Sequence, residues 1–282
     1  MLKSNFMRKI FAYLKFARLF NCILTALLVI FSFAVVHYWD FKDILLSILI
    51  FVSGTAFANI SNDMRDFKID LVVHPERPLV SGEITHKEAF FISIFLSAIL
   101  LISAISIGRK VFIFILTLYI FTLIYNFFLK KHHLWGNLAV AIISSATFLI
   151  AGVITGNFRP LVFPFVLSFV FQLYREILKD LHDQEGDRLG GYRTLPLIKG
   201  EKLTIILSQI LLIVLVILTL IPAIIGFYGK IYLYITLFLV DIPLITVGFR
   251  IREGMERRKL KKMLDLIKVP IMFVLVAIYL GG

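Results

Sequence analysis

The sequence predicts an all-α membrane protein with about nine transmembrane helices. The 282-residue chain is 60% hydrophobic, with a mean hydropathy of +0.93, well above the usage of ordinary soluble domains. Apolar runs of about 20 residues, each long enough to cross a bilayer, recur over its whole length. Charged residues gather in the segments between these runs, as expected where a chain leaves the membrane.

Nine apolar runs are expected to form the spans. In chain order they cover residues 19–37, 43–59, 89–107, 111–129, 137–156, 161–178, 203–227, 231–249 and 264–280. The first run is longer than the apolar part of a secretory signal and no small-residue cleavage site follows it, so it is expected to remain as a span. Because the runs leave no stretch for a soluble domain, residues 1–282 are expected to form one integral membrane domain.

The placement of lysine and arginine predicts the orientation. With nine spans, one side of the membrane carries the N-terminus and the loops after spans 2, 4, 6 and 8, and 25 of the 30 Lys and Arg residues fall there. The opposite side carries the other 5, which are Lys42, Arg109, Lys110, Arg159 and Lys230. The N-terminus is therefore expected in the cytoplasm and the C-terminus outside, in an integral, multi-pass protein of the cell membrane.

The formal net charge of +12 does not indicate a nucleic-acid partner. Lys and Arg lie in juxtamembrane clusters, the usual arrangement against anionic lipid headgroups, and the largest cluster, residues 250–268, is expected to face such headgroups. The lone cysteine, Cys22, lies within the first span, so no disulfide forms within the chain. Membrane lipid is the expected surrounding partner, and the sequence does not predict an oligomeric state.

Two acidic segments stand out from this basic background. Six of the 18 acidic residues lie within residues 59–88 and six within 174–202. The first segment has the pattern N-D-x-x-D-x-x-x-D, and the second has K-D-x-x-D-x-x-x-D. The residues of these patterns are Asn62, Asp63, Asp66 and Asp70 in motif 1, and Lys179, Asp180, Asp183 and Asp187 in motif 2. Carboxylates this close repel one another unless a cation lies between them.

The two segments also resemble each other as a repeat. Asp66 and Asp183, like Asp70 and Asp187, lie 117 positions apart, and four spans separate them, so both motifs return to the same face of the membrane. An Arg and then a Gly-Glu pair follow each motif. Two such units, near residues 59–88 and 174–202, would close one site between them; chance similarity over a few residues is the alternative.

Helix geometry would group the motif side chains. Positions i, i+4 and i+8 drift by only about 80° around a helix, so Asn62, Asp66 and Asp70 share a face if the second span continues as a helix past residue 60. Asp183 and Asp187 share a face likewise, with Asp180 one turn earlier. Carboxylate and amide oxygens suit Mg²⁺, which proteins hold with one or two carboxylates plus substrate phosphates. Solvated acidic loops that balance nearby Lys and Arg are the alternative.

On these residues the chain resembles the UbiA superfamily of intramembrane prenyltransferases. The resemblance covers nearly the whole chain and includes five further runs: Tyr13-Leu14-Lys15-Phe16-Ala17-Arg18, Arg77-Pro78-x-x-Ser81-Gly82, Tyr125-Asn126, Lys130-Lys131 and Gly136-Asn137. The run from Tyr174-Arg175-Glu176 through Lys179-Asp180 to Asp187 is most similar to the archaeal branch that makes digeranylgeranylglyceryl phosphate.

The resemblance implies a fold and a reaction. The fold is about nine transmembrane helices around a central cavity, with cytoplasmic cap segments after spans 2 and 6. The reaction is Mg²⁺-dependent transfer of a geranylgeranyl group from geranylgeranyl diphosphate to the sn-2 hydroxyl of geranylgeranylglyceryl phosphate, which forms the second ether bond of archaeal membrane lipid. Prenylation of an aromatic acceptor (4-hydroxybenzoate or a naphthoate) or of haem is the alternative within the superfamily. A membrane transporter is the alternative from another class.

The resemblance also implies roles for individual residues. The metal ligands would be Asn62, Asp66, Asp70, Asp183 and Asp187, with Asp66, Asp183 and Asp187 catalytic and Asp63 and Asp180 as further candidates. The diphosphate-binding residues would be Arg18, Tyr125, Lys130 and Lys131. The candidates for the acceptor's phosphate are Arg77, Lys179 and Arg193, which could instead face lipid headgroups. Asp241, a carboxylate inside span 8, is either functional or part of a structural hydrogen bond.

Overall fold

The structure is a computed structural model that describes residues 2–281, with side chains for residues 7–132 and 134–281. Residues 1 and 282, the chain ends that were expected in the cytoplasm and outside the cell, lie outside these ranges. Every regular element in the described chain is a helix, and the one addition is an isolated parallel bridge between His132 and Arg193.

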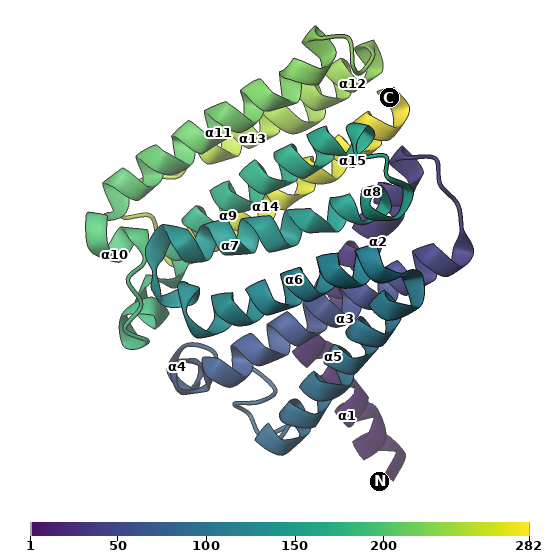
Figure 1. The fold of residues 1–282 in the computed structure, drawn as a ribbon. Coiled ribbons are helices and arrows are strands. Elements are labelled where there is room, and N and C mark those ends of the chain that lie inside the picture. The colour runs from purple at the N-terminus through teal and green to yellow at the C-terminus, as the bar shows by residue number, and fades with distance from the viewer. Residues whose placement is uncertain (1, 282) are drawn as a thin grey trace.

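The N-terminal half supplies one side of the bundle. Its helices are α1 (Leu2–Ala17), α2 (Leu19–Val35), α3 (Phe41–Arg65), α4 (Phe67–Val73), α5 (His86–Ile107) and α6 (Arg109–Phe127). A capping box starts α5, because the Thr85 side chain accepts from the Glu88 backbone while Glu88 accepts from the Thr85 backbone. Helix α3 contacts both α2 and α5 along its length (Figure 1).

The C-terminal half contains more broken helices. Its elements are η1 (Leu129–Lys131), α7 (His133–Ser145), η2 (Ala146–Leu149), α8 (Ile150–Thr155), η3 (Arg159–Leu161), α9 (Val162–Leu189), α10 (Leu195–Lys199), α11 (Glu201–Ile224), α12 (Lys230–Ile235), η4 (Thr236–Asp241), α13 (Ile242–Gly248), α14 (Arg257–Leu266) and α15 (Lys268–Gly281). Helix α9 is the centre of this half, since it packs against both α7 and α11.

The number of spans agrees with the prediction. Within residues 2–281, eight helices are long and apolar enough to cross a membrane, and the count reaches nine when the bent pair Met7–Ala17 and Leu19–Val35 is taken as one span. The two parts of that pair meet at an angle of 57°, at Arg18, whose backbone is left-handed (φ 56°). The expectation that the first span begins at residue 19 missed α1, which extends helix almost to the N-terminus.

Two short helices lie where cap segments were expected. Helix α4 follows α3 directly, and α10 follows α9 after a five-residue loop. Figure 1 shows both at one end of the bundle, with α8, α12 and the end of α15 at the other. Because α4 also packs against α9, the ends of α3 and α9 that carry the two acidic motifs are brought together.

Asp241 belongs to the packing of the bundle. It ends the π-helix η4, is almost fully buried, and accepts from the Thr219 hydroxyl at 2.9 and 3.0 Å. Tyr232 donates to the Thr219 backbone oxygen at 2.7 Å, so the three residues tie η4 and α12 to α11. These contacts favour the structural alternative for this carboxylate over a functional one.

Candidate active site

A cavity of about 190 Å³ lies between the ends of α3 and α9, and side chains of both acidic motifs line it. The lining residues among those expected from the sequence are Arg18, Asn62, Asp66, Asp70, Arg77, Tyr125, Lys130, Lys179, Asp180, Asp183 and Asp187. Asp63 is buried beside the cavity. Lys131 and Arg193 are exposed and do not line it; the Arg193 amide instead donates to the Lys131 carbonyl at 3.2 Å.

Two arginines neutralise the outer carboxylates of motif 1. Arg18 Nη2 lies 2.8 Å from Asp63 Oδ1, and Arg77 Nη1 lies 3.1 Å from the same oxygen. Arg77 also contacts Asp70 Oδ2 at 2.5 Å. Burial raises the pKa of Asp70, and the Arg77 contact opposes that shift. Motif 1 thus holds two guanidinium groups at the edge of the cavity.

Asp70 follows a bend in the chain after α3. That helix ends at Arg65, and Asp66 forms a bend before α4 begins at Phe67. The helix passes residue 60 as the prediction required, and despite the bend Asn62, Asp66 and Asp70 all line the same cavity. The backbone hydrogen bonds from residue i to residue i−4 continue through the bend. The Asp66 amide donates to the Asn62 carbonyl and the Asp70 amide donates to the Asp66 carbonyl, each at 2.9 Å.

Lys130 occupies the inner part of motif 1. Its Nζ contacts both Asn62 Oδ1 and Asp66 Oδ2. Burial lowers the pKa of Lys130, and the neighbouring Asp66 carboxylate opposes this. The other Asp66 oxygen accepts from Tyr192 Oη at 2.6 Å, and Lys130 Nζ lies 5.5 Å from the centre of the Tyr192 ring. Burial and the Asp66 contact raise the pKa of this phenol, so it acts as a hydrogen-bond donor.

The carboxylates of motif 2 have a different set of partners. Asp180 Oδ2 accepts from Asn137 Nδ2 at 2.9 Å, and Asp183 Oδ1 lies 2.6 Å from His182 Nδ1. Asp187 Oδ2 is buried with no hydrogen-bond partner. Among the side chains that the structure describes, no Lys or Arg forms an ion pair with any of these three aspartates.

Glu176 lies on the same helix, nearer to its apolar part. It is buried and pairs with two cations, Arg175 Nη1 at 2.7 Å and Lys179 Nζ at 3.3 Å. Of these three residues, Glu176 and Lys179 line the cavity. Lys179 was expected at the site, whereas Arg175 and Glu176 were part of the family resemblance and had no predicted role.

Several cavity residues were not predicted from the sequence. Tyr192 lies in the loop after α9, and nothing in its surroundings in the sequence marks it. Asn137 lies near the start of a span, and the fold brings it to Asp180 of motif 2, which is 43 positions away in the sequence. Arg257 begins α14, pairs with Glu185 and lines the cavity, although its basic cluster was expected to face lipid headgroups. Spacing along the chain carries no signal for such contacts between distant elements.

The residues present fit a hard divalent cation. No group of three His, Cys, Asp or Glu side chains within the described part of the chain lies close enough to form a metal site by itself. The donors are nonetheless the carboxylate and amide oxygens that Mg²⁺ prefers, and Mg²⁺ usually keeps waters and substrate phosphates among its ligands. The buried Asp187 oxygen without a partner is the atom that a bound cation would satisfy.

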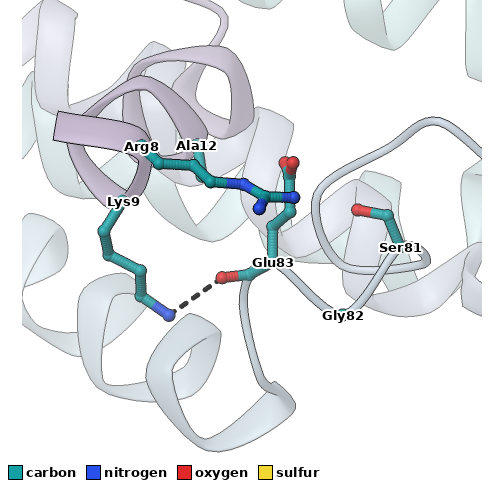
Figure 2. Close-up of a pocket in the computed structure, with 6 residues that line it drawn as sticks. All are labelled: Arg8, Lys9, Ala12, Ser81, Gly82 and Glu83. Carbon is teal, nitrogen blue, oxygen red and sulfur yellow. Dashed lines mark hydrogen bonds between the residues drawn. The ribbon is translucent and has the colours of Figure 1, made fainter. Parts of the chain in front are cut away.

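A second hollow, of about 350 Å³, is separate from the motifs. Figure 2 shows Arg8 and Lys9 of α1 facing the turn at Ser81, Gly82 and Glu83. Lys9 Nζ donates to the Glu83 carbonyl at 2.8 Å and pairs with Glu88 at 2.9 Å. Its cation is thus already engaged, and none of the motif aspartates lines this hollow.

Comparison with known proteins identifies relatives of this chain. The model of the UbiA prenyltransferase family matches residues 22–275. A digeranylgeranylglyceryl phosphate synthase of Methanosphaera stadtmanae is 29% identical, over 96% of this chain and 98% of that protein. The digeranylgeranylglyceryl phosphate synthase of Pyrococcus furiosus is 31% identical, over 96% of each.

Solved structures share the fold. A structure of digeranylgeranylglyceryl phosphate synthase matches with a TM-score of 0.77 at 29% identity, over 97% of this chain and 98% of that one. A UbiA homolog from Archaeoglobus fulgidus bound to GPP and Mg²⁺ has a TM-score of 0.69 at 20% identity, over 95% and 99%. The predicted helical membrane fold is confirmed, and at 20% identity the second likeness concerns the fold alone.

Proposed function

This chain belongs to the UbiA prenyltransferase family, and on that premise we propose that it makes digeranylgeranylglyceryl phosphate. A geranylgeranyl group would pass from geranylgeranyl diphosphate to the sn-2 hydroxyl of geranylgeranylglyceryl phosphate, forming an ether bond. The observation that carries the proposal is the meeting of both acidic motifs in one cavity. Nearly full-length relatives with that activity in their names support it, and family membership removes the transporter alternative.

The proposed metal ligands come from both motifs. Asn62, Asp66, Asp183 and Asp187, with Asp180 nearby, would hold Mg²⁺ together with the diphosphate. When bound, Mg²⁺ supplies positive charge that offsets the charge developing on the diphosphate as its bond to carbon breaks. Asp70 was expected as a further ligand, but its contact with Arg77 supports a role in orienting that arginine.

Cations already held at the cavity would bind the diphosphate. Lys130 and Arg18 each contact a motif 1 carboxylate and could exchange it for a phosphate oxygen, and Tyr125 also lines the cavity. Hydrogen bonds between charged groups are the stronger kind, so these residues would orient the leaving group. Since Lys131 is exposed outside the cavity, a direct contact with the diphosphate is proposed for Lys130 alone of the pair.

Bond cleavage and transfer then follow. The electron pair of the C–O bond leaves with the diphosphate, and the allylic carbon accepts the sn-2 oxygen of the acceptor, whose hydroxyl proton is released. The buried cavity would keep water from competing with the acceptor. The distribution of Lys and Arg supports placing the cavity mouth on the cytoplasmic side.

The experiment that tests this function uses the purified protein with geranylgeranyl diphosphate and Mg²⁺. We expect a two-chain ether phospholipid from geranylgeranylglyceryl phosphate, detected by mass spectrometry, and no product when the divalent cation is removed by chelation. Parallel reactions contain 4-hydroxybenzoate or a naphthoate as the acceptor. Rapid prenylation of an aromatic acceptor with no reaction on the glyceryl lipid would overturn the proposed acceptor and leave the family membership intact.

A further inference from the structure

One group of side chains beside the cavity carries more positive than negative charge. The Glu176 carboxylate, only 8% exposed, lies between Arg175 and Lys179 at 2.7 and 3.3 Å. Two cations therefore share one carboxylate, and when all three are ionised the group has one positive charge in excess. The next anion along this side of α9, Asp183, is paired with His182, so the two cations can accept a further anionic ligand.

The other cations that line the cavity are balanced. Their pairings are Arg18 and Arg77 with Asp63 and Asp70, Lys130 with Asp66, and Arg257 with Glu185. Among the described cations at the site, the excess is thus confined to Arg175 and Lys179. This distinguishes them from Arg77, whose guanidinium contacts two carboxylates, and from Arg193, which is exposed.

The position of this pair along α9 also matters. Arg175, Lys179 and Asp183 follow one another at four-residue intervals, so they lie along one side of the helix. At a rise of 1.5 Å per residue, Lys179 lies about 6 Å and Arg175 about 12 Å along the axis from Asp183. Both lie toward the apolar start of α9, on the side of the motif where the hydrocarbon parts of the substrates must extend.

Lys179 is open to a ligand. Its side chain is 48% exposed, although it lines the cavity, so its ammonium can turn from Glu176 to another anion without leaving the site. The neighbouring guanidinium of Arg175 can bind two oxygens of one phosphate at once. Glu176 holds both cations on one side of the helix.

We propose that Arg175 and Lys179 form the subsite for the anionic group of the acceptor, with Glu176 as a positioning residue. The inference rests on the proposed function, in which that group is the phosphate monoester of a glyceryl lipid. It replaces two of the three residues expected from the sequence, Arg77 and Arg193, by one that was not expected. The phosphate would be held one to two helical turns along α9 from Asp183, so that the sn-2 hydroxyl of the same glyceryl group could reach the allylic carbon.

The test compares two acceptors that differ only in the charged group. Purified full-length enzyme is given geranylgeranylglyceryl phosphate or geranylgeranylglycerol, with geranylgeranyl diphosphate in excess, and kcat/KM is measured for each. We expect the wild type to prefer the phosphorylated acceptor. Arg175→Gln and Lys179→Gln should each reduce this preference by about 10- to 100-fold, the loss expected for one charge-assisted contact, while the rate with geranylgeranylglycerol stays nearly constant.

Controls separate recognition from folding. Arg175→Lys should recover part of the preference because it restores the charge, and Arg258→Gln, which removes an exposed cation from α14, should leave it unchanged. Equal losses with both acceptors, or a raised KM for geranylgeranyl diphosphate alone, would overturn the subsite.

The result also separates the subsite from the proposed function. If the wild type prenylates 4-hydroxybenzoate and neither glyceryl lipid, the proposed function is wrong. The same variants are then compared with 4-hydroxybenzoate and its uncharged methyl ester. Loss of the preference for the carboxylate would retain the subsite for an aromatic acid, and an unchanged preference would overturn it.

Discussion

Motif 1 and motif 2 are similar in sequence but differ in how their charge is balanced. In motif 1 the carboxylates Asp63, Asp66 and Asp70 all contact a Lys or Arg side chain. In motif 2 the partners are an amide and a histidine, and Asp187 Oδ2 has none. The carboxylates of motif 1 are thus already paired with cations of the protein, whereas those of motif 2 have no described Lys or Arg partner, which under the proposed function favours motif 2 as the first contact for the metal.

This comparison suggests an order of events. A divalent cation would first meet motif 2, because among the described side chains no Lys or Arg forms an ion pair with its three aspartates. Motif 1 would join only when the diphosphate draws Lys130 and Arg18 away from their carboxylates. The two motifs would then contribute to one site in the complex, although they are unequal before substrate binds.

The largest effect is expected from the aspartates. Asp66→Asn and Asp183→Asn should each lower kcat by about 1000-fold, since each removes a proposed metal ligand worth several kcal/mol in the transition state. Without substrate, however, binding of Mn²⁺ followed by electron paramagnetic resonance should weaken in Asp183→Asn and not in Asp66→Asn. Equal loss of substrate-free binding in the two variants would show that the motifs are equivalent.

A smaller, two-sided effect is expected from Lys130. Lys130→Gln removes the ammonium that contacts Asn62 and Asp66, so substrate-free Mn²⁺ binding should tighten. The KM for geranylgeranyl diphosphate should rise by about 10- to 100-fold, because a charge-assisted contact with the phosphate is lost. If both affinities fall together, Lys130 supports the fold rather than competing with the metal.

The smallest effect is expected from Tyr192. Tyr192→Phe keeps the ring and removes only the hydrogen bond to Asp66 Oδ1, so kcat/KM should fall by roughly tenfold, the value of one hydrogen bond to a charged group. Raising the Mg²⁺ concentration should restore part of the loss, because the role of the phenol is to orient a metal ligand. A loss that is independent of Mg²⁺ would place Tyr192 outside the metal site.

The sequence predicted the fold well because apolar runs and charged loops are local properties. The spans, their number and the pairing of two motifs at one end of the bundle depend on composition and on the even number of spans between residues 66 and 183. The bend at Asp66 and the helix before Arg18 were missed, since both lie where polar residues interrupt the hydropathy pattern.

The site was predicted less completely. Motif residues were found because their spacing is visible in one segment. Tyr192 and Asn137 act on aspartates 126 and 43 positions away, and no local pattern reports such a contact. Arg193 lies in the segment that follows motif 2, but its side chain is exposed and does not line the cavity. Arg175, two turns before Asp183, pairs with Glu176, which does line it.

The charge excess at Arg175 and Lys179 has a consequence for turnover. The phosphate that this pair is proposed to hold is the same in the acceptor and in the product, because the reaction changes only the sn-2 oxygen. Such uniform binding lowers KM without lowering the barrier to ether formation, and it retains the product as firmly by its headgroup as the acceptor. Release of the two-chain lipid would therefore depend on its tails and on the departure of the diphosphate. Under this proposal, binding of the headgroup phosphate limits the rate of product release.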